Sequence, residues 1–330
     1  MDAPPETTPK AEPLARNRLP FWVAITVGIA YGLMGRFVFD RGSSRFFEIV
    51  SVTFVFLVPL VMGFLTGVCD ARARRPRWWS CIRLCALNSA AMLVIVMLIG
   101  WEGSICVVMM IPIFIPLAII GGLVGFGLEK SMRNGPDVMA GVALLPFLVS
   151  PLEQQIDPGE SLRDVETSIT IAADPATVWG AIARVPEIGV EELPASWATR
   201  IGFPRPVAAT LSHEGVGGVR HATFEGGVLF IETVTVWEPE RRLAFTIHAD
   251  ADTIPPETLD EHVVVGGPIF DVLTGEYRIE PLASGGVRLR LTSRHRLSTH
   301  LEPYAGYWTD FVMRDIQETI LAVIKDRCER

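Results

Sequence analysis

Serine, histidine and aspartate recur in the last third of the chain, where they offer the parts of a hydrolytic triad: Ser293, His295 and either Asp271 or Asp315. A working triad needs its nucleophile within hydrogen-bond reach of the base. Ser293 and His295 are two residues apart in a predicted strand, so they lie roughly 7 Å apart on one face. The sequence also has no G-x-S-x-G nucleophile elbow. These observations disfavour hydrolase chemistry.

Asp315 has a second interpretation, because it falls in one stripe of the helix predicted over residues 303–327. At about 100° per residue the stripe contains Tyr304, Trp308, Val312, Asp315, Thr319 and Val323, and we expect it to face a sheet. A carboxylate on such a surface needs a partner. We predict an Asp315–His295 pair that orients a polar ligand group or acts as an acid/base. The alternatives are a purely structural pair, or an Asp315 bonded to backbone or to Arg220.

Charged residues on two predicted strands give further candidates. Glu232 shares a strand face with Phe230, which makes it a candidate acid inside a cavity. The last strand places four arginines on one face: Arg288, Arg290, Arg294 and Arg296. Such a stripe binds an anionic lipid headgroup or pairs across the sheet, where Glu276 and Glu280 are available.

The five cysteines and six histidines show no metal-binding pattern. The sequence lacks a C-x-x-C pair, a zinc-ligand spacing and any H-x-H or H-x-x-x-H pair. Cys81 and Cys85 are one helical turn apart beside an apolar segment, and we interpret them as small apolar residues. We expect neither a metal nor a cofactor.

The elements that position these residues divide the chain into two unlike halves. After residue 157 there are 26 of the 37 acidic residues, 16 of the 29 basic ones and all six histidines. An acidic second half argues against nucleic acid as a partner.

The first half predicts an integral membrane protein. Residues 1–20 are polar and proline-rich, typical of a disordered tail. Apolar segments follow at residues 21–39, 49–68, 84–100, 105–128 and 138–152. The first four are long enough to cross the hydrocarbon region as helices. The fifth is short and contains Pro146, so it is either a fifth span or an interfacial helix.

The distribution of basic residues favours a cytoplasmic N-terminus. With five spans, ten Lys/Arg flank one side of the membrane and four flank the other. A fifth crossing then places the second half outside the cytoplasm, whereas four crossings leave it inside. We favour five.

The spans themselves show little chemistry. Asn88 is the only strongly polar residue deep in a predicted span, and we expect no buried acid there, which disfavours a transporter. Gly121-x-x-x-Gly125 in the fourth span predicts a close helix contact or a seam for a homo-oligomer. The alternative is the ordinary glycine content of a membrane helix.

After a linker at residues 153–164, the pattern changes to alternation of apolar and polar residues. Residues 165–171 alternate as a half-buried strand, and Asp174-Pro175 begins a helix. Six more strands are predicted between residues 207 and 299, followed by the long helix over 303–327. This order indicates an α+β domain over residues 165–330.

That order, together with Ile169–Trp179, Glu232–Leu243 and Gly275–Pro281, resembles the START-like (SRPBCC) superfamily, which includes the polyketide cyclase/dehydrase and lipid transport group. The resemblance covers about residues 160–330. It implies a helix-grip fold, in which a curved antiparallel sheet surrounds a long C-terminal helix. It also implies an apolar cavity between them, with Gly266-Gly267-Pro268 and Thr253–Asp260 as candidate mouth segments.

The resemblance implies a ligand and no particular reaction, because the superfamily shares a cavity shape and no catalytic motif. We predict a membrane-anchored module that binds a lipid or other apolar small molecule. The alternatives are a cyclase or hydratase acting on a membrane-derived substrate, and a ligand-responsive membrane sensor. The residues expected to line the cavity are Phe230, Glu232, Phe245, Asp271, Tyr277, Ser293, His295, Tyr304, Trp308 and Asp315.

Overall fold

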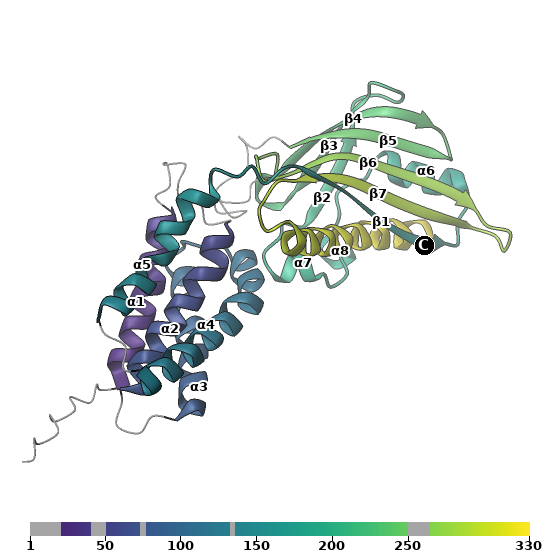
Figure 1. The fold of residues 1–330 in the computed structure, drawn as a ribbon. Coiled ribbons are helices and arrows are strands. Elements are labelled where there is room, and N and C mark those ends of the chain that lie inside the picture. The colour runs from purple at the N-terminus through teal and green to yellow at the C-terminus, as the bar shows by residue number, and fades with distance from the viewer. Residues whose placement is uncertain (1–20, 41–50, 73–76, 133–135, 250–264) are drawn as a thin grey trace, which may run out of the picture.

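A bundle of helices and a curved sheet form the two parts of the protein (Figure 1). The structure is a computed structural model that describes residues 21–40, 51–72, 77–132, 136–249 and 265–330. The predicted tail at residues 1–20 and the insertion Thr253–Asp260 lie outside the described residues.

The helical part contains four helices that are long and apolar enough to cross a membrane, over Trp22–Phe39, Thr53–Ala71, Trp78–Leu98 and Ser104–Ser131. The elements are α1 (Phe21–Asp40), a π-helical turn (Thr53–Leu57) that continues into α2 (Val58–Ala71), α3 (Trp78–Leu98) and α4 (Ser104–Met132). The first four predicted spans are confirmed as apolar helices. Helix α3 begins six residues before the predicted segment, because a helix continues through Arg83 where hydropathy alone breaks off.

The fifth apolar segment forms α5 (Pro136–Glu153), which packs against α2 and the π-helical turn before it. Its 18 residues span about 27 Å. Glu153 accepts hydrogen bonds from the backbone N–H groups of Val52 and Thr53 at 2.6 and 2.8 Å. This contact ties the end of α5 to the start of the second span, next to the sheet. The N-terminal end of α1 therefore lies at the opposite end of the bundle from the sheet domain (Figure 1).

Glycines bring α2 and α4 into backbone contact. A Cβ added at Gly121 would lie 1.9 Å from the Leu60 carbonyl oxygen, and one at Gly125 would lie 2.3 Å from that of Phe64. On the other side, a Cβ at Gly63 would lie 1.9 Å from the Ala118 carbonyl oxygen. The Gly121-x-x-x-Gly125 motif thus forms a close contact within the chain, as small residues do between membrane helices.

Buried acids in the helical part contradict the expectation that its spans lack them. Asp70 and Glu129 are both buried near the end of the bundle remote from the sheet, where Arg72 donates two 2.9 Å hydrogen bonds to Glu129. Both residues lie at the ends of predicted apolar runs, where the helices continue past the runs. Asn88 lies deeper and donates to the Thr66 hydroxyl at 3.1 Å.

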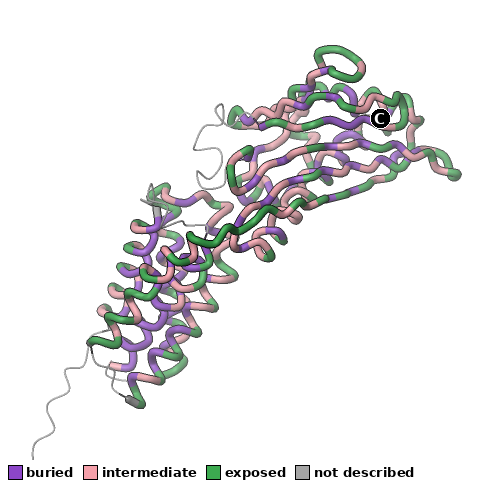
Figure 2. Tube along the Cα trace, turned by 45° about the horizontal axis from the view of Figure 1, so that its top comes forward, coloured by how far each residue is buried: buried purple, intermediate pink, exposed green. Residues whose placement is uncertain are grey.

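The second half is a seven-stranded antiparallel sheet in the order β1-β7-β6-β5-β4-β3-β2. The strands are β1 (Ser161–Ile171), β2 (Pro206–Leu211), β3 (Val219–Phe224), β4 (Leu229–Glu238), β5 (Arg242–Ala249), β6 (Phe270–Pro281) and β7 (Val287–Leu297). Buried and exposed residues alternate along the strands (Figure 2). The predicted inward face of β7 is confirmed, since its alternate residues from Val287 to Leu297 are all buried.

Helices complete the domain: α6 (Pro175–Ala183), α7 (Trp197–Arg200) and α8 (Glu302–Cys328). The Asp174 side chain caps α6 by accepting from the Thr177 N–H at 3.0 Å, and proline occupies the first turn as predicted. The sheet curls over α8 (Figure 1), which confirms the helix-grip architecture.

Arg327 anchors the C-terminal end of α8. Its guanidinium donates to Glu192 at 2.7 and 3.1 Å and to the Pro186 and Glu187 carbonyl oxygens at 3.1 and 2.8 Å. Hydrogen bonds from Arg327 lower the pKa of the Glu192 carboxyl from its ordinary 4.5 to about 2. These contacts fix the C-terminal end of α8.

The Arg327–Glu192 pair predicts an acid-sensitive component of stability. A lowered folded-state pKa means that the unfolded chain binds the proton first, so stability is lost as pH falls from 4.5 towards 2. Urea unfolding of the full chain at a series of pH values should show a shallower decline for Glu192→Gln than for wild type. Glu191→Gln, which changes the neighbouring exposed acid, should decline like wild type. Equal declines in all three proteins would contradict the assignment.

Candidate functional site

An apolar cavity of about 130 Å³ lies between the concave face of the sheet and α8. Strands β2 to β7 contribute to its wall, and α8 contributes Met313, Ile316, Gln317 and Ile320. We call it the inner cavity. Its lining is mostly aliphatic and aromatic, which is the usual composition of a small-molecule site.

Within the described part of this lining, the charge comes from a single ion pair of buried side chains, Arg220 with Glu232. Arg220 Nη1 lies 2.5 Å from a Glu232 carboxylate oxygen, and the two side chains are 4% and 9% exposed. The two residues face each other in the β3–β4 register. The guanidinium also lies over the rings of Phe245 and Tyr277, at 5.4 and 5.9 Å from their centroids.

The electrostatics of the pair follow from its burial. Burial raises the pKa of the Glu232 carboxyl, and the Arg220 guanidinium opposes that rise. Burial also raises the pKa of the Tyr277 phenol. Arg220 Nε is buried and has no hydrogen-bond partner among the described residues, so one donor of the guanidinium is unsatisfied.

A second polar group crosses the cavity wall between the sheet and α8. Gln317 accepts from the Thr167 hydroxyl at 2.9 Å and donates to Ser293 Oγ at 2.9 Å and to the Val165 carbonyl oxygen at 3.1 Å. All three of these hydrogen-bond partners of Gln317 lie on β1 and β7. This network fixes α8 against the sheet and leaves Ser293 as an acceptor without a nearby base.

The structure brings half of the predicted cavity residues together. The five that line the inner cavity are Phe230, Glu232, Phe245, Tyr277 and Ser293. Asp271 lies on the other face of β6 from its cavity-lining neighbours Phe270 and Val272. Arg220, Gln317 and Met313 line the cavity although the sequence did not single them out for it.

The predicted Asp315–His295 pair is wrong. Asp315 accepts hydrogen bonds from the Ser196 hydroxyl and from the N–H groups of Trp197 and Ala198, the latter at 3.1 and 2.8 Å. It therefore caps α7 from the side of α8 that faces away from the sheet. The backbone alternative of the sequence analysis is the correct one.

His295 has other partners on the first turns of α8. Its Nε2 lies 3.2 Å from the Thr309 hydroxyl and 3.6 Å from an Asp310 carboxylate oxygen. Burial lowers the pKa of the imidazole, and Asp310 opposes that shift. The side chain is fully buried and does not line the inner cavity, which argues for a structural role.

The arginine stripe on β7 pairs across the sheet. Arg290 contacts Glu166 at 2.7 Å and Glu280 at 3.0 Å, and Arg294 contacts Asp164 at 2.7 Å. Glu276 pairs instead with Arg242 on β5 at 2.7 Å. The pairing interpretation therefore holds for this outer face.

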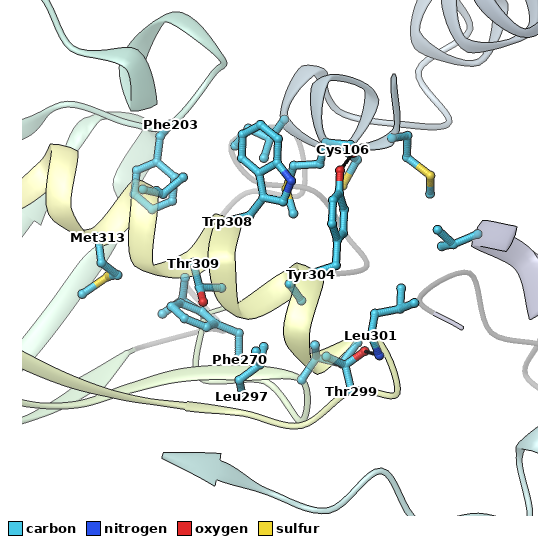
Figure 3. A pocket seen from close by; sticks show the side chains of 18 of the residues that line it. Cys106, Phe203, Phe270, Leu297, Thr299, Leu301, Tyr304, Trp308, Thr309 and Met313 are labelled. Carbon is cyan, nitrogen blue, oxygen red and sulfur yellow. Dashed lines mark hydrogen bonds between the residues drawn. The ribbon is translucent and has the colours of Figure 1, made fainter. Parts of the chain in front are cut away.

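Tyr304 and Trp308 line a different cavity, of about 170 Å³, between the sheet domain and the helical bundle. We call it the junction cavity. In Figure 3 both side chains project from α8 towards the helix that carries Cys106, while Phe270 and Leu297 lie on the sheet side. Phe203 and Met313 lie at the far end of the labelled group.

Comparison with known proteins gives one family match. The model of the family described as polyketide cyclase/dehydrase and lipid transport matches residues 163–329. No curated protein matches the chain.

Several solved structures are similar to the second half. An uncharacterized protein from Rhizobium leguminosarum is 14% identical, with a TM-score of 0.32, over 52% of this chain and 99% of its own. Ara h 8.0201 is 14% identical, with a TM-score of 0.33, over 52% of this chain and 100% of its own. The Aha1 dimer from Colwellia psychrerythraea is 16% identical, with a TM-score of 0.29, over 51% of this chain and 96% of its own.

Proposed function

Because the chain belongs to the polyketide cyclase/dehydrase and lipid transport family, we propose that it is a membrane-anchored module that holds a lipid or other apolar small molecule in the inner cavity. The observation that carries the proposal is the apolar cavity with one buried ion pair in its wall. Four apolar helices in the same chain supply the anchor.

The lining indicates how such a molecule is oriented. The hydrocarbon part packs against the aromatic and aliphatic side chains, where burial is favourable. An oxygen of the ligand accepts a hydrogen bond from the free Nε donor of Arg220. Ligands with a carboxyl, carbonyl or hydroxyl group at one end of an apolar skeleton fit this arrangement.

Fluorescence of cis-parinaric acid, a fatty acid that emits when bound in an apolar site, tests the proposal with the full chain in detergent. Ala222→Phe adds a ring inside the inner cavity, so probe binding should be lost. His221→Phe places the same ring on the exposed side of the same strand and should bind like wild type. Wild-type binding by Ala222→Phe would sink the proposal.

One observation favours an enzyme on the same scaffold as a second candidate. Glu232 has a raised pKa inside an apolar cavity, which is a common property of a general acid or base. Turnover separates the two functions. A binder returns the molecule that co-purifies with it unchanged after prolonged incubation, whereas an enzyme converts it to a product that mass spectrometry detects.

We further propose a cytoplasmic N-terminus and a sheet domain on the opposite side of the membrane. The bundle consists of α1 to α5, and Arg72, Arg77 and Lys130 lie at the ends of α2, α3 and α4 that are remote from the sheet. With five spans, the sequence assigns ten basic residues to this side of the membrane. Alkaline phosphatase, which is active only when exported, should be active when fused after Gly103 or after Glu160 and silent after Arg77. Activity after Gly103 with silence after Glu160 would mean that α5 does not cross.

A further inference from the structure

The junction cavity is built by both halves of the protein. The bundle contributes the first turns of α4, including Cys106 and Met109, and the sheet domain contributes one side of α8, including Tyr304, Trp308 and Val312. Figure 3 shows the α8 side chains pointing towards the α4 side. Neither half encloses this space alone.

Direct contacts between the bundle and the sheet domain fix their relative position around the junction cavity. The Ser104 hydroxyl donates to the Ile201 carbonyl oxygen at 2.7 Å, and the Tyr304 hydroxyl donates to the Met109 carbonyl oxygen. Leu301, next to the start of α8, is buried in the same apolar cluster as core residues of the bundle. Gly202 has a φ of +106°, and a Cβ there would lie 2.6 Å from Ser104 Oγ, so the close approach depends on glycine.

The chemistry of the wall selects an uncharged, apolar occupant. Among the residues that the structure describes, Glu102 is the one charged residue in the lining, and it is already paired with Arg36 at 2.5 Å in a buried ion pair. The remaining lining is aliphatic, aromatic or methionine, with two threonines and Cys106. Such a wall accepts a hydrocarbon chain and offers no counter-charge to a phosphate or carboxylate.

The junction cavity adjoins the inner cavity. Four side chains line both of them: Phe203, Val265, Phe270 and Met313. One layer of side chains is thus all that separates the two spaces at this point. Met313 is unbranched and adopts many shapes at little cost, which suits a movable partition.

Because the two cavities share these four side chains, we propose that the junction cavity takes up the hydrocarbon chain of a bilayer lipid at the N-terminal end of α4 and passes it to the inner cavity. The bundle is then an entry port as well as an anchor. Transfer of the hydrocarbon chain to the inner cavity rests on the proposed function, whereas binding of the hydrocarbon chain in the junction cavity does not. An acyl chain that follows this route moves from the bilayer into the protein without crossing water, where exposure of each methylene group costs free energy.

Photocrosslinking tests occupancy in the full chain. The protein is reconstituted in vesicles of phosphatidylcholine that carry a diazirine near the end of one acyl chain, illuminated and mapped by peptide mass spectrometry. We expect label on the α4 peptide with Met109 and on the α8 peptide with Met313. Met109→Trp fills the junction cavity from α4 and should abolish the label at Met313. Ile111→Trp, on an exposed position of the same helix, should leave it intact.

A second variant separates the effect of a filled cavity from misfolding of the first variant. Val312→Trp fills the same cavity from α8, with exposed Arg314→Trp as its control. In both cavity-filling variants, transfer of cis-parinaric acid from vesicles should slow, while the amount bound at equilibrium stays that of wild type. Unchanged label at Met313 and unchanged transfer rates in both variants would overturn the entry route, even if parinaric acid binds.

The two proposals fail in different ways. If the inner cavity holds no ligand, parinaric acid does not bind to any variant, yet the diazirine lipid still labels Met109. If the junction cavity holds no lipid chain, Met109 and Trp308 stay unlabelled in wild type while parinaric acid binds. The first outcome removes the proposed function and the second removes the entry port.

Discussion

Glu232→Leu in the full chain should destabilise the sheet domain by about 3–5 kcal/mol, because it leaves the buried Arg220 guanidinium without its counter-ion. The double variant Arg220→Met/Glu232→Leu removes both charges and should recover most of that loss, since two apolar side chains replace a desolvated pair. Urea unfolding in detergent, followed by near-ultraviolet circular dichroism, measures both changes.

A partly exposed pair on the same sheet provides the control. Arg242 and Glu276 also meet at 2.7 Å, but their side chains are 38% and 24% exposed. Glu276→Leu should therefore cost less than about 1 kcal/mol. If Glu232→Leu costs no more than Glu276→Leu, the pair is not buried as described. If the double variant keeps its fold but no longer binds parinaric acid, the pair serves the ligand rather than the fold.

Gly121→Leu should disrupt the helical bundle. An added Cβ would lie 1.9 Å from the Leu60 carbonyl oxygen, and backbone gives way far less readily than a side chain. Overpacking of this kind costs about 1–3 kcal/mol or more. Loss of the monodisperse peak on size exclusion after brief heating in detergent measures the effect.

Gly127→Leu is the matched control on the same helix. A Cβ at Gly127 has no atom within 4 Å, so this variant should survive heating like wild type. Equal heat resistance of the two variants would mean that α2 and α4 do not touch through Gly121.

The sequence was most informative for elements whose pattern of apolar and polar residues is regular along their whole length. Continuous apolar runs predicted the four long helices, and strict alternation predicted which residues of β7 face inward. Each pattern depends on the surroundings of one element alone. A long apolar helix is in apolar surroundings on every side, and a strand of this sheet is buried on one face only.

The error at Asp315 has the opposite cause, because α8 is covered on several sides. Its sheet side carries Met313, Gln317 and Ile320, whereas Tyr304 and Trp308 face the bundle. A helix with apolar residues on two faces has no unique stripe, so periodicity alone could not tell which face meets the sheet. That choice depends on the contact with the bundle, which no local pattern records.

The Arg220–Glu232 pair was within reach of the sequence. Glu225, Gly226 and Gly227 connect β3 to β4, and Gly226 and Gly227 adopt positive φ angles of 71° and 84°. A hairpin centred on Gly226 places Arg220 opposite Glu232 by simple counting, as the observed register does. The pattern within β4 alone points to Glu232, whereas its partner becomes evident only from the pairing of the two strands.

The connection between α5 and β1 limits the distance between the sheet domain and the apolar helices. Only residues 154–160 join Glu153 to Ser161, and seven residues extend at most about 25 Å. A binding protein free in solution meets a membrane-dissolved molecule only by collision. Under the proposed function, so short a connection fixes the distance between the domain and the bilayer. The local concentration of bilayer lipid at the domain is then set by geometry and is independent of the amount of protein. Lengthening this segment with flexible residues would convert the same domain into a slower, concentration-dependent collector.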